Sequence, residues 1–444
     1  MYSVSTLADG DVTAAAVDLL TARSKDRPVW VRVGRLIDGV SDRPFHDACI
    51  VFDAKQIYAV TKDGAKPDSG LLAEGQEAPD ADLADFTIMP CLIEAHAHLF
   101  LEGAPVNAQQ RMLYLKQDPE SLLESARARW PKLLKFGVGT VRDAGDKHGV
   151  GLTLAAEAQA QRDRLTTTPW IDSPGAAIHR LGRYGSFMSE PIEDYASPAE
   201  CVAARIRQGA RRIKLIVSGI INFKEGRVTA PPQLITDDVA ALVKAAGEHG
   251  RQTFAHASGT AGIEHAIAGG ITTVEHGFFC TQEQLARMRD QNTAWVPTFA
   301  PVQAQIDHAD ELGWEPEVVG HLSRIIDAHR QMLSLGHSMG VQVLAGSDAG
   351  SCGVPHGMGL LAELSHMETA GMPAMAVLKS ATGSSAATLD FTEPIGRIAV
   401  GCRSRMIFTR HDPLRTVANL QKEKTVVFDG EVTHCDGDVS TAGL

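Results

Sequence analysis

The sequence contains no apolar run approaching the roughly 20 residues that a membrane-spanning helix requires. Its first thirty residues lack the basic start and apolar stretch of a secretory signal. Basic residues are in the minority, because 42 lysines and arginines stand against 54 aspartates and glutamates, which gives a formal net charge of -12. This charge disfavours general binding to nucleic acid or to anionic membranes. We therefore expect a cytoplasmic protein that acts on a small molecule, with no nucleic-acid and no membrane partner.

Paired cysteine motifs are missing as well. The seven cysteines are odd in number, widely spaced and never arranged as Cys-x-x-Cys. Neither a disulfide framework nor a zinc finger is therefore indicated. We expect reduced, mostly buried thiols.

Two kinds of pattern divide the chain. Residues 29–60 and 396–434 contain short β-branched runs between turn residues, which predicts antiparallel strands at both ends. The middle alternates strand-like apolar runs with Ala- and Leu-rich helical stretches, which is typical of repeated βα units. Eight candidate strands begin at Ile88, Gly139, Pro169, Arg212, Gln252, Thr272, Ala294 and Val341. The predicted fold class is α/β, a (β/α)₈ TIM-type barrel with a small β-sandwich domain built from both chain ends.

These patterns also predict the domain boundaries. We expect an N-terminal extension over residues 1–28, a composite small β domain over 29–85 and 390–444, and the barrel over 86–389. Helical patterns are clearest at 11–24, 121–137 and 237–250.

Polar residues occur along the predicted barrel strands, whose carboxyl ends carry the active sites of such barrels. His96 and His98 are two residues apart in the first strand, so both side chains point to one face and can hold one metal ion. A lone histidine among 17 is more often structural, a strand lysine usually extends its amine to water, and an aspartate in a turn is often only a turn residue. The regular distribution over separate strands outweighs these alternatives for the further candidates, which are Lys214, His256, His276 and Asp348.

With these residues in place, the sequence resembles the amidohydrolase superfamily. Within it, the chain is similar to the imidazolonepropionase-related branch that includes Xaa-Pro dipeptidases and metallo-carboxypeptidases. The resemblance runs from about Val29 to the C-terminal strands and rests on the stretch PCLIEAHAH together with the four later candidates. It implies two divalent metal ions, with zinc as the first choice, and a carboxylated lysine that bridges them. The implied ligands are His96, His98 and Asp348 for one ion, His256 and His276 for the other, and N6-carboxylated Lys214 as the bridge.

The resemblance further implies a hydrolase acting on carbon-nitrogen bonds. It would cleave the C–N amide bond of a small substrate, a dipeptide such as Xaa-Pro or an N-acyl amino acid, by metal-activated hydroxide. Asp348 would act as general base and then as general acid. We expect a homo-oligomer, as is common for proteins of this size and kind.

Three departures from the family pattern lie near the expected site. Cys91 stands where the family usually has glycine and Glu94 where it has aspartate, and we expect both to adjust packing without affecting ligation. Tyr184 aligns with a family histidine in the loop after the third strand. Its hydroxyl could donate a hydrogen bond to a developing oxyanion, and the equally weighted alternative is a partly buried loop aromatic.

Substrate recognition also departs from the pattern. Related Xaa-Pro dipeptidases carry a carboxylate-binding tyrosine after the fourth strand, and Leu234 occupies that position here. Lys224 or Arg227 could supply a substitute charge, although each also reads as a solvated loop residue. Arg142 and His356 match family positions near the cleft and complete the expected substrate-binding set.

Three other functions remain open at this stage. Loss of the tyrosine and an apolar loop would suit a hydrolase of non-peptide amides, ureas or carbamates of the xenobiotic type. An imidazolonepropionase-like ring-opening enzyme or a deaminase would be mononuclear, and Lys214 disfavours it. A non-catalytic scaffold has no reason to keep an expensive charged cluster.

Overall fold

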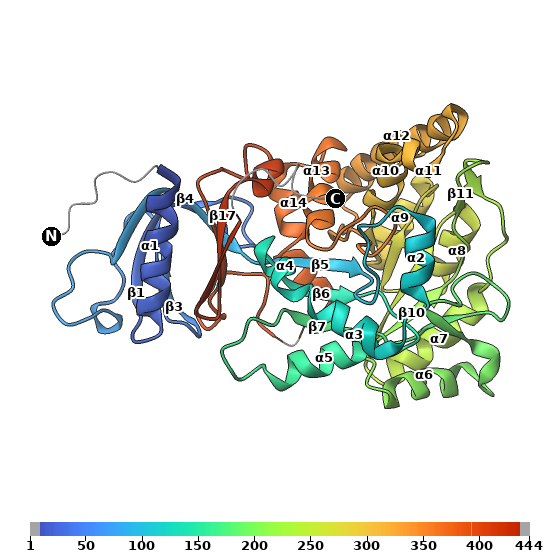
Figure 1. The fold of residues 1–444 in the computed structure, drawn as a ribbon, viewed down its shortest axis with the longest axis horizontal. Coiled ribbons are helices and arrows are strands. Elements are labelled where there is room, and N and C mark those ends of the chain that lie inside the picture. Colours follow the sequence, from blue (N-terminus) through green and yellow to red (C-terminus); the bar gives the residue numbers. More distant parts are fainter. Residues whose placement is uncertain (1–8, 392, 436–444) are drawn as a thin grey trace.

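A seven-stranded sheet combines strands from both ends of the chain. The computed structural model describes residues 9–391 and 393–435. The strands of this sheet run in the order β18-β17-β16-β4-β1-β2-β3, and Figure 1 shows the early and late strands together at one end of the molecule. Their bounds are β1 Val29–Leu36, β2 Phe45–Phe52, β3 Ile57–Thr61, β4 Ala81–Pro90, β16 Arg405–Thr409, β17 Lys424–Phe428 and β18 Glu431–Cys435.

This sheet has its own apolar core. Val31, Phe52 and Phe408 belong to one buried cluster that draws on strands from both chain ends. The helix α1, Asp9–Ser24, packs against the sheet through Val17 and Leu20. The helix expected at 11–24 is thus present, whereas the sandwich arrangement and the domain boundaries stay predictions.

The middle of the chain forms parallel sheets. A three-stranded sheet has the order β5-β6-β7, and a six-stranded sheet has the order β15-β14-β13-β10-β8-β9. The bounds are β5 Leu92–Ala97, β6 Val138–Asp143, β7 Trp170–Asp172, β8 Ala177–His179, β9 Ser189–Pro191, β10 Arg212–Ile216, β13 Gln252–Ala257, β14 Thr273–His276 and β15 Ala294–Val296. The fold is therefore a mixed α/β fold with parallel strands, and the closed eight-stranded barrel stays a prediction.

The eighth expected strand is reduced to single bridges. Val343 pairs with Trp295 in β15, and Ala349 pairs with Ala97 in β5. The segment between them turns sharply, because Asp348 has a φ of 55°. Residues 341–350 therefore lie between β15 and β5 without forming a regular ladder.

Helices follow most of the parallel strands. Their bounds are α2 Ala108–Leu115, α3 Pro119–Arg127, α4 Trp130–Lys135, α5 Val150–Ala160, α6 Pro198–Arg207, α7 Thr236–Glu248, α8 Thr260–Ala268, α9 Gln282–Gln291, α10 Ala300–Asp307, α11 Ala309–Leu312, α12 Pro316–Met339, α13 Met358–Thr369, α14 Ala374–Ser380 and α15 Gly383–Thr388. The helix expected at 237–250 is α7, whereas the stretch 121–137 is divided into α3 and α4. Pro131 explains the division, because proline is tolerated in the first turn of a helix but not in its interior.

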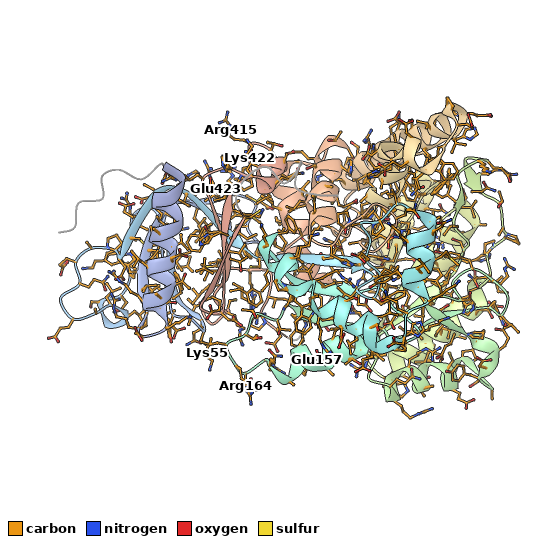
Figure 2. The ribbon with its side chains drawn as sticks, viewed as in Figure 1. Lys55, Glu157, Arg164, Arg415, Lys422 and Glu423 are labelled. Atoms are coloured by element: carbon orange, nitrogen blue, oxygen red, sulfur yellow. The ribbon has the colours of Figure 1, made fainter. Side chains whose placement is uncertain are left out.

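The surface and the thiols agree with the composition. Charged side chains such as Lys55, Arg164 and Glu423 are exposed and project from the outline of the molecule in Figure 2. All seven cysteines are free, and six of them are buried, which agrees with the expectation of mostly buried thiols. Over the described ranges, every helix is too short or too polar to cross a membrane.

Candidate metal centre and active site

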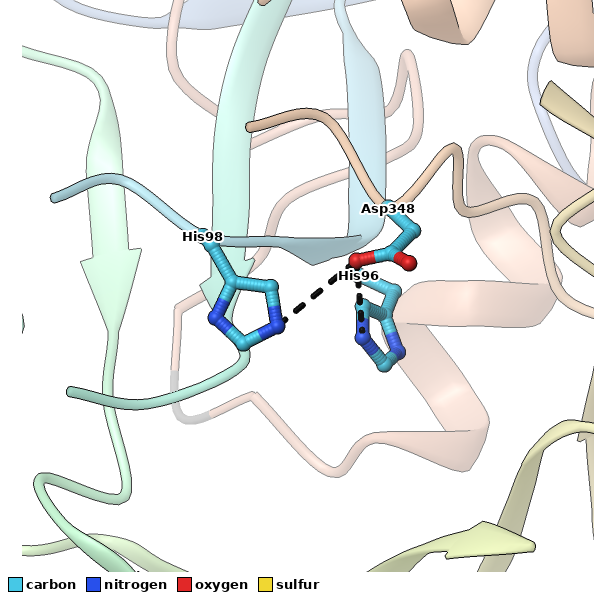
Figure 3. A group of neighbouring side chains, drawn as sticks. All are labelled: His96, His98 and Asp348. Atoms are coloured by element: carbon cyan, nitrogen blue, oxygen red, sulfur yellow. Dashed lines mark ion pairs between the residues drawn. The ribbon is translucent and has the colours of Figure 1, made fainter. Parts of the chain in front are cut away.

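Three side chains from two distant parts of the sequence converge at the carboxyl end of β5. His96 lies in β5, His98 follows that strand directly, and Asp348 lies in the segment that bridges to it. Both Nε2 atoms lie 3.6 Å from Oδ1 of Asp348, and Figure 3 shows both rings directed at that oxygen. His96 Nε2 and Asp348 Oδ1 are buried without a hydrogen-bond partner among the described residues. Two imidazole nitrogens and one carboxylate oxygen gathered in this way fit a divalent cation.

Hydrogen bonds behind the rings determine which nitrogen each histidine presents. Nδ1 of His96 lies 2.5 Å from Oε2 of Glu275, and the Arg142 guanidinium donates to both oxygens of Glu275 at 2.9 Å. Nδ1 of His98 lies 3.0 Å from the carbonyl oxygen of Gly145. Because an acceptor faces each Nδ1, that nitrogen carries the proton and each Nε2 turns its lone pair toward the shared site.

The segment that carries Asp348 packs closely against β5. The Asp348 N–H donates to the His96 carbonyl at 2.7 Å. A Cβ on Gly346 would lie 2.6 Å from Cγ1 of Val296 and 2.8 Å from the His96 nitrogen, so this approach requires glycine. Asp348 itself has a positive φ, which is uncommon for a residue with a side chain and clusters at functional sites.

The two departures beside the histidine pair have structural contacts. Glu94 accepts hydrogen bonds from the Ser347 N–H at 2.9 Å and from the Ser347 hydroxyl at 2.5 Å. It thereby ties β5 to the residue before Asp348, and burial raises the pKa of Glu94 to about 7. Cys91 is buried, and burial raises the pKa of its thiol to about 12.

A second group of expected ligands lies beside this triad. The ring centroids of His256 and His276 are 4.5 Å apart, and those of His96 and His276 are 5.1 Å apart. Nδ1 of His276 lies 2.8 Å from the Thr298 hydroxyl, so its Nε2 is left for the centre. Lys214 lies within β10, whose five residues are all buried. The structure thus brings all six expected ligands into one region.

Burial sets the protonation of this region. It lowers the pKa of Lys214 to about 8 and raises that of Asp348 to about 7. Burial also lowers the pKa of all four imidazoles, to about 3 for His98, to about 4 for His256, and well below the ordinary range for His96 and His276. Neutral imidazole is the form that binds a metal ion, and an unprotonated lysine amine is the form that reacts with CO₂.

A cavity of about 330 Å³ opens at this centre. Asp348 and Lys214 line it, and most of its wall is apolar, including Leu115, Phe187, Ile221, Phe223, Phe278 and Val302. Tyr184 also lines the cavity, with its ring 5.5 Å from that of His256. Burial and the nearby Asp348 raise the pKa of Tyr184, so its hydroxyl remains a hydrogen-bond donor near neutral pH. A cavity of this size and character suits a small, largely apolar ligand.

Four residues expected to bind substrate lie outside this lining, namely Arg142, Lys224, Arg227 and His356. Arg142 is 1% exposed and donates a hydrogen bond to Glu275. Lys224 and Arg227 are exposed on the surface. His356 is buried, with Nε2 2.7 Å from the Leu101 carbonyl. Substrate binding by these residues stays a prediction.

Sequence reasoning missed two residues near the centre. Glu275 precedes His276 in β14, and a glutamate inside a buried parallel strand was an available signal. Arg111 on α2 lines the cavity but carried no such signal, because an arginine on a half-exposed helix is ordinary.

Comparison with known proteins adds to this geometry. The model of the amidohydrolase family matches residues 87–433. Ochratoxinase from Aspergillus niger is 24% identical over 423 residues, which covers 89% of this chain and 84% of that protein. A crystal structure of a Xaa-Pro dipeptidase with bound methionine has a TM-score of 0.76 at 26% identity and covers 92% of this chain and 100% of that one. Molinate hydrolase has a TM-score of 0.69 at 18% identity, covers 92% of this chain and 95% of that one, and shares the fold.

Proposed function

Because the chain belongs to the amidohydrolase family and is a hydrolase acting on C–N bonds, we propose that it cleaves an amide bond of a small substrate in a metal-dependent reaction. The observation that carries this proposal is the convergence of His96 Nε2, His98 Nε2 and Asp348 Oδ1 on one buried point. Charged and polar atoms that lack partners in a protein interior are costly unless a ligand satisfies them.

We assign six residues to a binuclear centre. His96, His98 and Asp348 would hold the first ion, and His256 and His276 would hold the second. Lys214, carboxylated on its amine, would supply a ligand shared by both ions. The lowered pKa of Lys214 supports this role, because only an unprotonated amine takes up CO₂. When bound, divalent cations lower the pKa of water and polarise the carbonyl under attack.

The remaining steps belong to the protein. Asp348 takes the proton of the attacking water and passes it to the leaving nitrogen, and the elevated pKa of its carboxyl suits both transfers. Tyr184 lines the same cavity, and its hydroxyl donates a hydrogen bond to the developing oxyanion. Glu275 and Thr298 keep the histidine rings in orientation from behind.

Two substrate classes fit the apolar cavity. The first is a dipeptide such as Xaa-Pro or an N-acyl amino acid, in keeping with the structural likeness to a Xaa-Pro dipeptidase. The second is a non-peptide amide, urea or carbamate. Leu234 favours this alternative, because it is fully buried at the position of the family's carboxylate-binding tyrosine.

Metal analysis and a substrate panel test the proposal together. We expect two ions per chain in the wild type, loss of activity in Lys214→Ala, and recovery of that variant with short carboxylic acids that replace the carbamate. Lys244→Ala is the matched control, because its side chain is 80% exposed on α7. A single tightly bound ion would contradict the bridged centre. Failure to hydrolyse any L-Xaa-L-Pro dipeptide, N-acyl amino acid, aryl amide or phenylurea would contradict the activity.

A further inference from the structure

Arg111 is a cation in the cavity wall that the proposed chemistry leaves unused. It lies in α2, whose first turn is capped by the Asn107 side chain. Among the described residues, Arg111 and Lys214 are the arginine and lysine side chains that line the cavity. Lys214 lies at the metal centre, whereas Arg111 is half-buried on a helix beside the cavity. The two cations are thus available for different tasks.

The guanidinium of Arg111 is oriented but not neutralised. It donates to the carbonyl oxygens of Pro105 at 3.4 Å and of Gly350 at 3.2 Å. Across residues 9–391 and 393–435, no carboxylate pairs with it. A guanidinium has five N–H donors, so most of them stay available to a planar anion. Backbone carbonyls therefore hold in place a cationic side chain that lines the cavity.

The contact with Gly350 brings Arg111 close to the segment that carries Asp348. Gly350 is two residues after Asp348, the residue that we assign to protonation of the leaving nitrogen. Arg111 and Asp348 also line the same cavity. Arg111 therefore approaches the part of the cavity that carries Asp348.

Other cations are badly placed for the same task. Lys224 and Arg227 lie outside the cavity lining, and Arg227 pairs with Glu225 at 2.7 Å. Leu234 is fully buried and apolar. The position that binds carboxylate in the resembled dipeptidases thus offers no donor here, and Arg111 approaches the cavity from a different element.

We propose that Arg111 binds the α-carboxylate of the leaving amino acid through a bidentate ion pair. The substrates would then be N-acyl amino acids or dipeptides with a free carboxylate and a bulky apolar C-terminal side chain, which Phe223 and Phe278 in the wall would accommodate. This inference rests on the proposed amide hydrolysis and narrows it to one substrate class.

A matched pair of probes tests the role of the carboxylate. N-benzoyl-L-phenylalanine and N-(2-phenylethyl)benzamide share the scissile amide and the phenyl group, but only the first has a carboxylate. In Arg111→Met we expect kcat/KM for the acid to fall about 10- to 100-fold, as for loss of one partner of a partly shielded charge pair, with the neutral amide unchanged. Arg111→Lys should restore part of the loss. Arg127→Met on α3 is the control, because Arg127 forms an exposed pair with Glu157 outside the cavity.

Binding of the same two compounds to the metal-loaded protein, measured by calorimetry, separates this inference from the proposed activity. Arg111-dependent binding of the acid without turnover would contradict hydrolysis of this amide class and support the carboxylate site. Turnover of both probes with equal losses in Arg111→Met, or with no loss, would overturn the carboxylate site and leave the hydrolase proposal intact. Equal binding of the acid to wild type and Arg111→Met would also overturn it.

Discussion

The buried contact between Glu275 and Arg142 makes a sharp prediction about the first metal site. Glu275 is fully buried and Arg142 is 1% exposed, and Glu275 accepts hydrogen bonds from both Arg142 and the Nδ1 of His96. Glu275→Gln keeps the volume of the side chain and removes its charge. The guanidinium is then left buried beside a neutral amide, and His96 loses a charged acceptor.

Two effects of different size follow. Removing one partner of a buried ion pair costs about 3–5 kcal/mol, because the other charge stays uncompensated in a dry interior. Loss of the group that orients a metal-ligating histidine weakens metal binding by about 10- to 100-fold. The same substitution at Glu264 should cost less than about 1 kcal/mol, because Glu264 and its partner Arg287 are 44% and 38% exposed and solvent screens them.

Two measurements check these effects. Urea denaturation of the metal-free protein gives the loss of stability, and competition with a chelator gives the loss of metal affinity. Equal stability losses in Glu275→Gln and Glu264→Gln would refute the buried-pair argument. Unchanged metal affinity in Glu275→Gln would refute the orienting role. Arg142→Lys provides a second test if Glu275→Gln fails to fold, because it keeps the charge but loses the bidentate geometry.

Two further predictions concern Gly346 and Glu363. In Gly346→Ala the new Cβ would lie 2.6 Å from Val296 and 2.8 Å from the His96 backbone, so we expect reduced metal content and a lower melting temperature. Gly247→Ala, in the last turn of α7 where nothing lies within 4 Å of the new Cβ, should instead stabilise by up to about 1 kcal/mol. Equal effects in both variants would contradict the packing argument. Burial raises the pKa of Glu363 from 4.5 to about 8. The folded state therefore binds the proton more tightly than the unfolded state. The resulting contribution to stability is present at low pH and is lost as the pH rises through about 8. The free energy of unfolding of the wild type relative to Glu363→Gln should therefore fall by up to about 1.4 kcal/mol per pH unit between about pH 5 and 8, and a difference that does not vary with pH in denaturation experiments would contradict this.

The periodicity of apolar residues and the residue types predicted much of the secondary structure. The strands β10 and β13 could be predicted from continuous runs of residues suited to burial. The helix α7 could be predicted from its acidic first turn and its Ala-rich face. Pro131 indicates that residues 121–137 form two helices. The helical pattern continues on either side of Pro131, so a single helical stretch was predicted. The segment 341–350 lacks a regular strand because its path depends on close contact with β5, which local sequence does not encode.

The stretch PCLIEAHAH and the four later candidates were enough to predict the amidohydrolase family, to which the match over residues 87–433 assigns the chain. The direction of side chains in parallel strands also predicted that His96, Lys214 and His256 lie near one edge of the sheet. The position of Asp348 and the set of side chains that line the cavity depend on tertiary packing, because residues 341–350 form no regular strand. Arg142 proved to hold Glu275 from behind, Lys224 and Arg227 proved to face solvent, and Arg111 reached the cavity wall from α2. A strand fixes the direction of its side chains through the pleat, whereas helices and loops acquire theirs only from packing against residues far away in the chain.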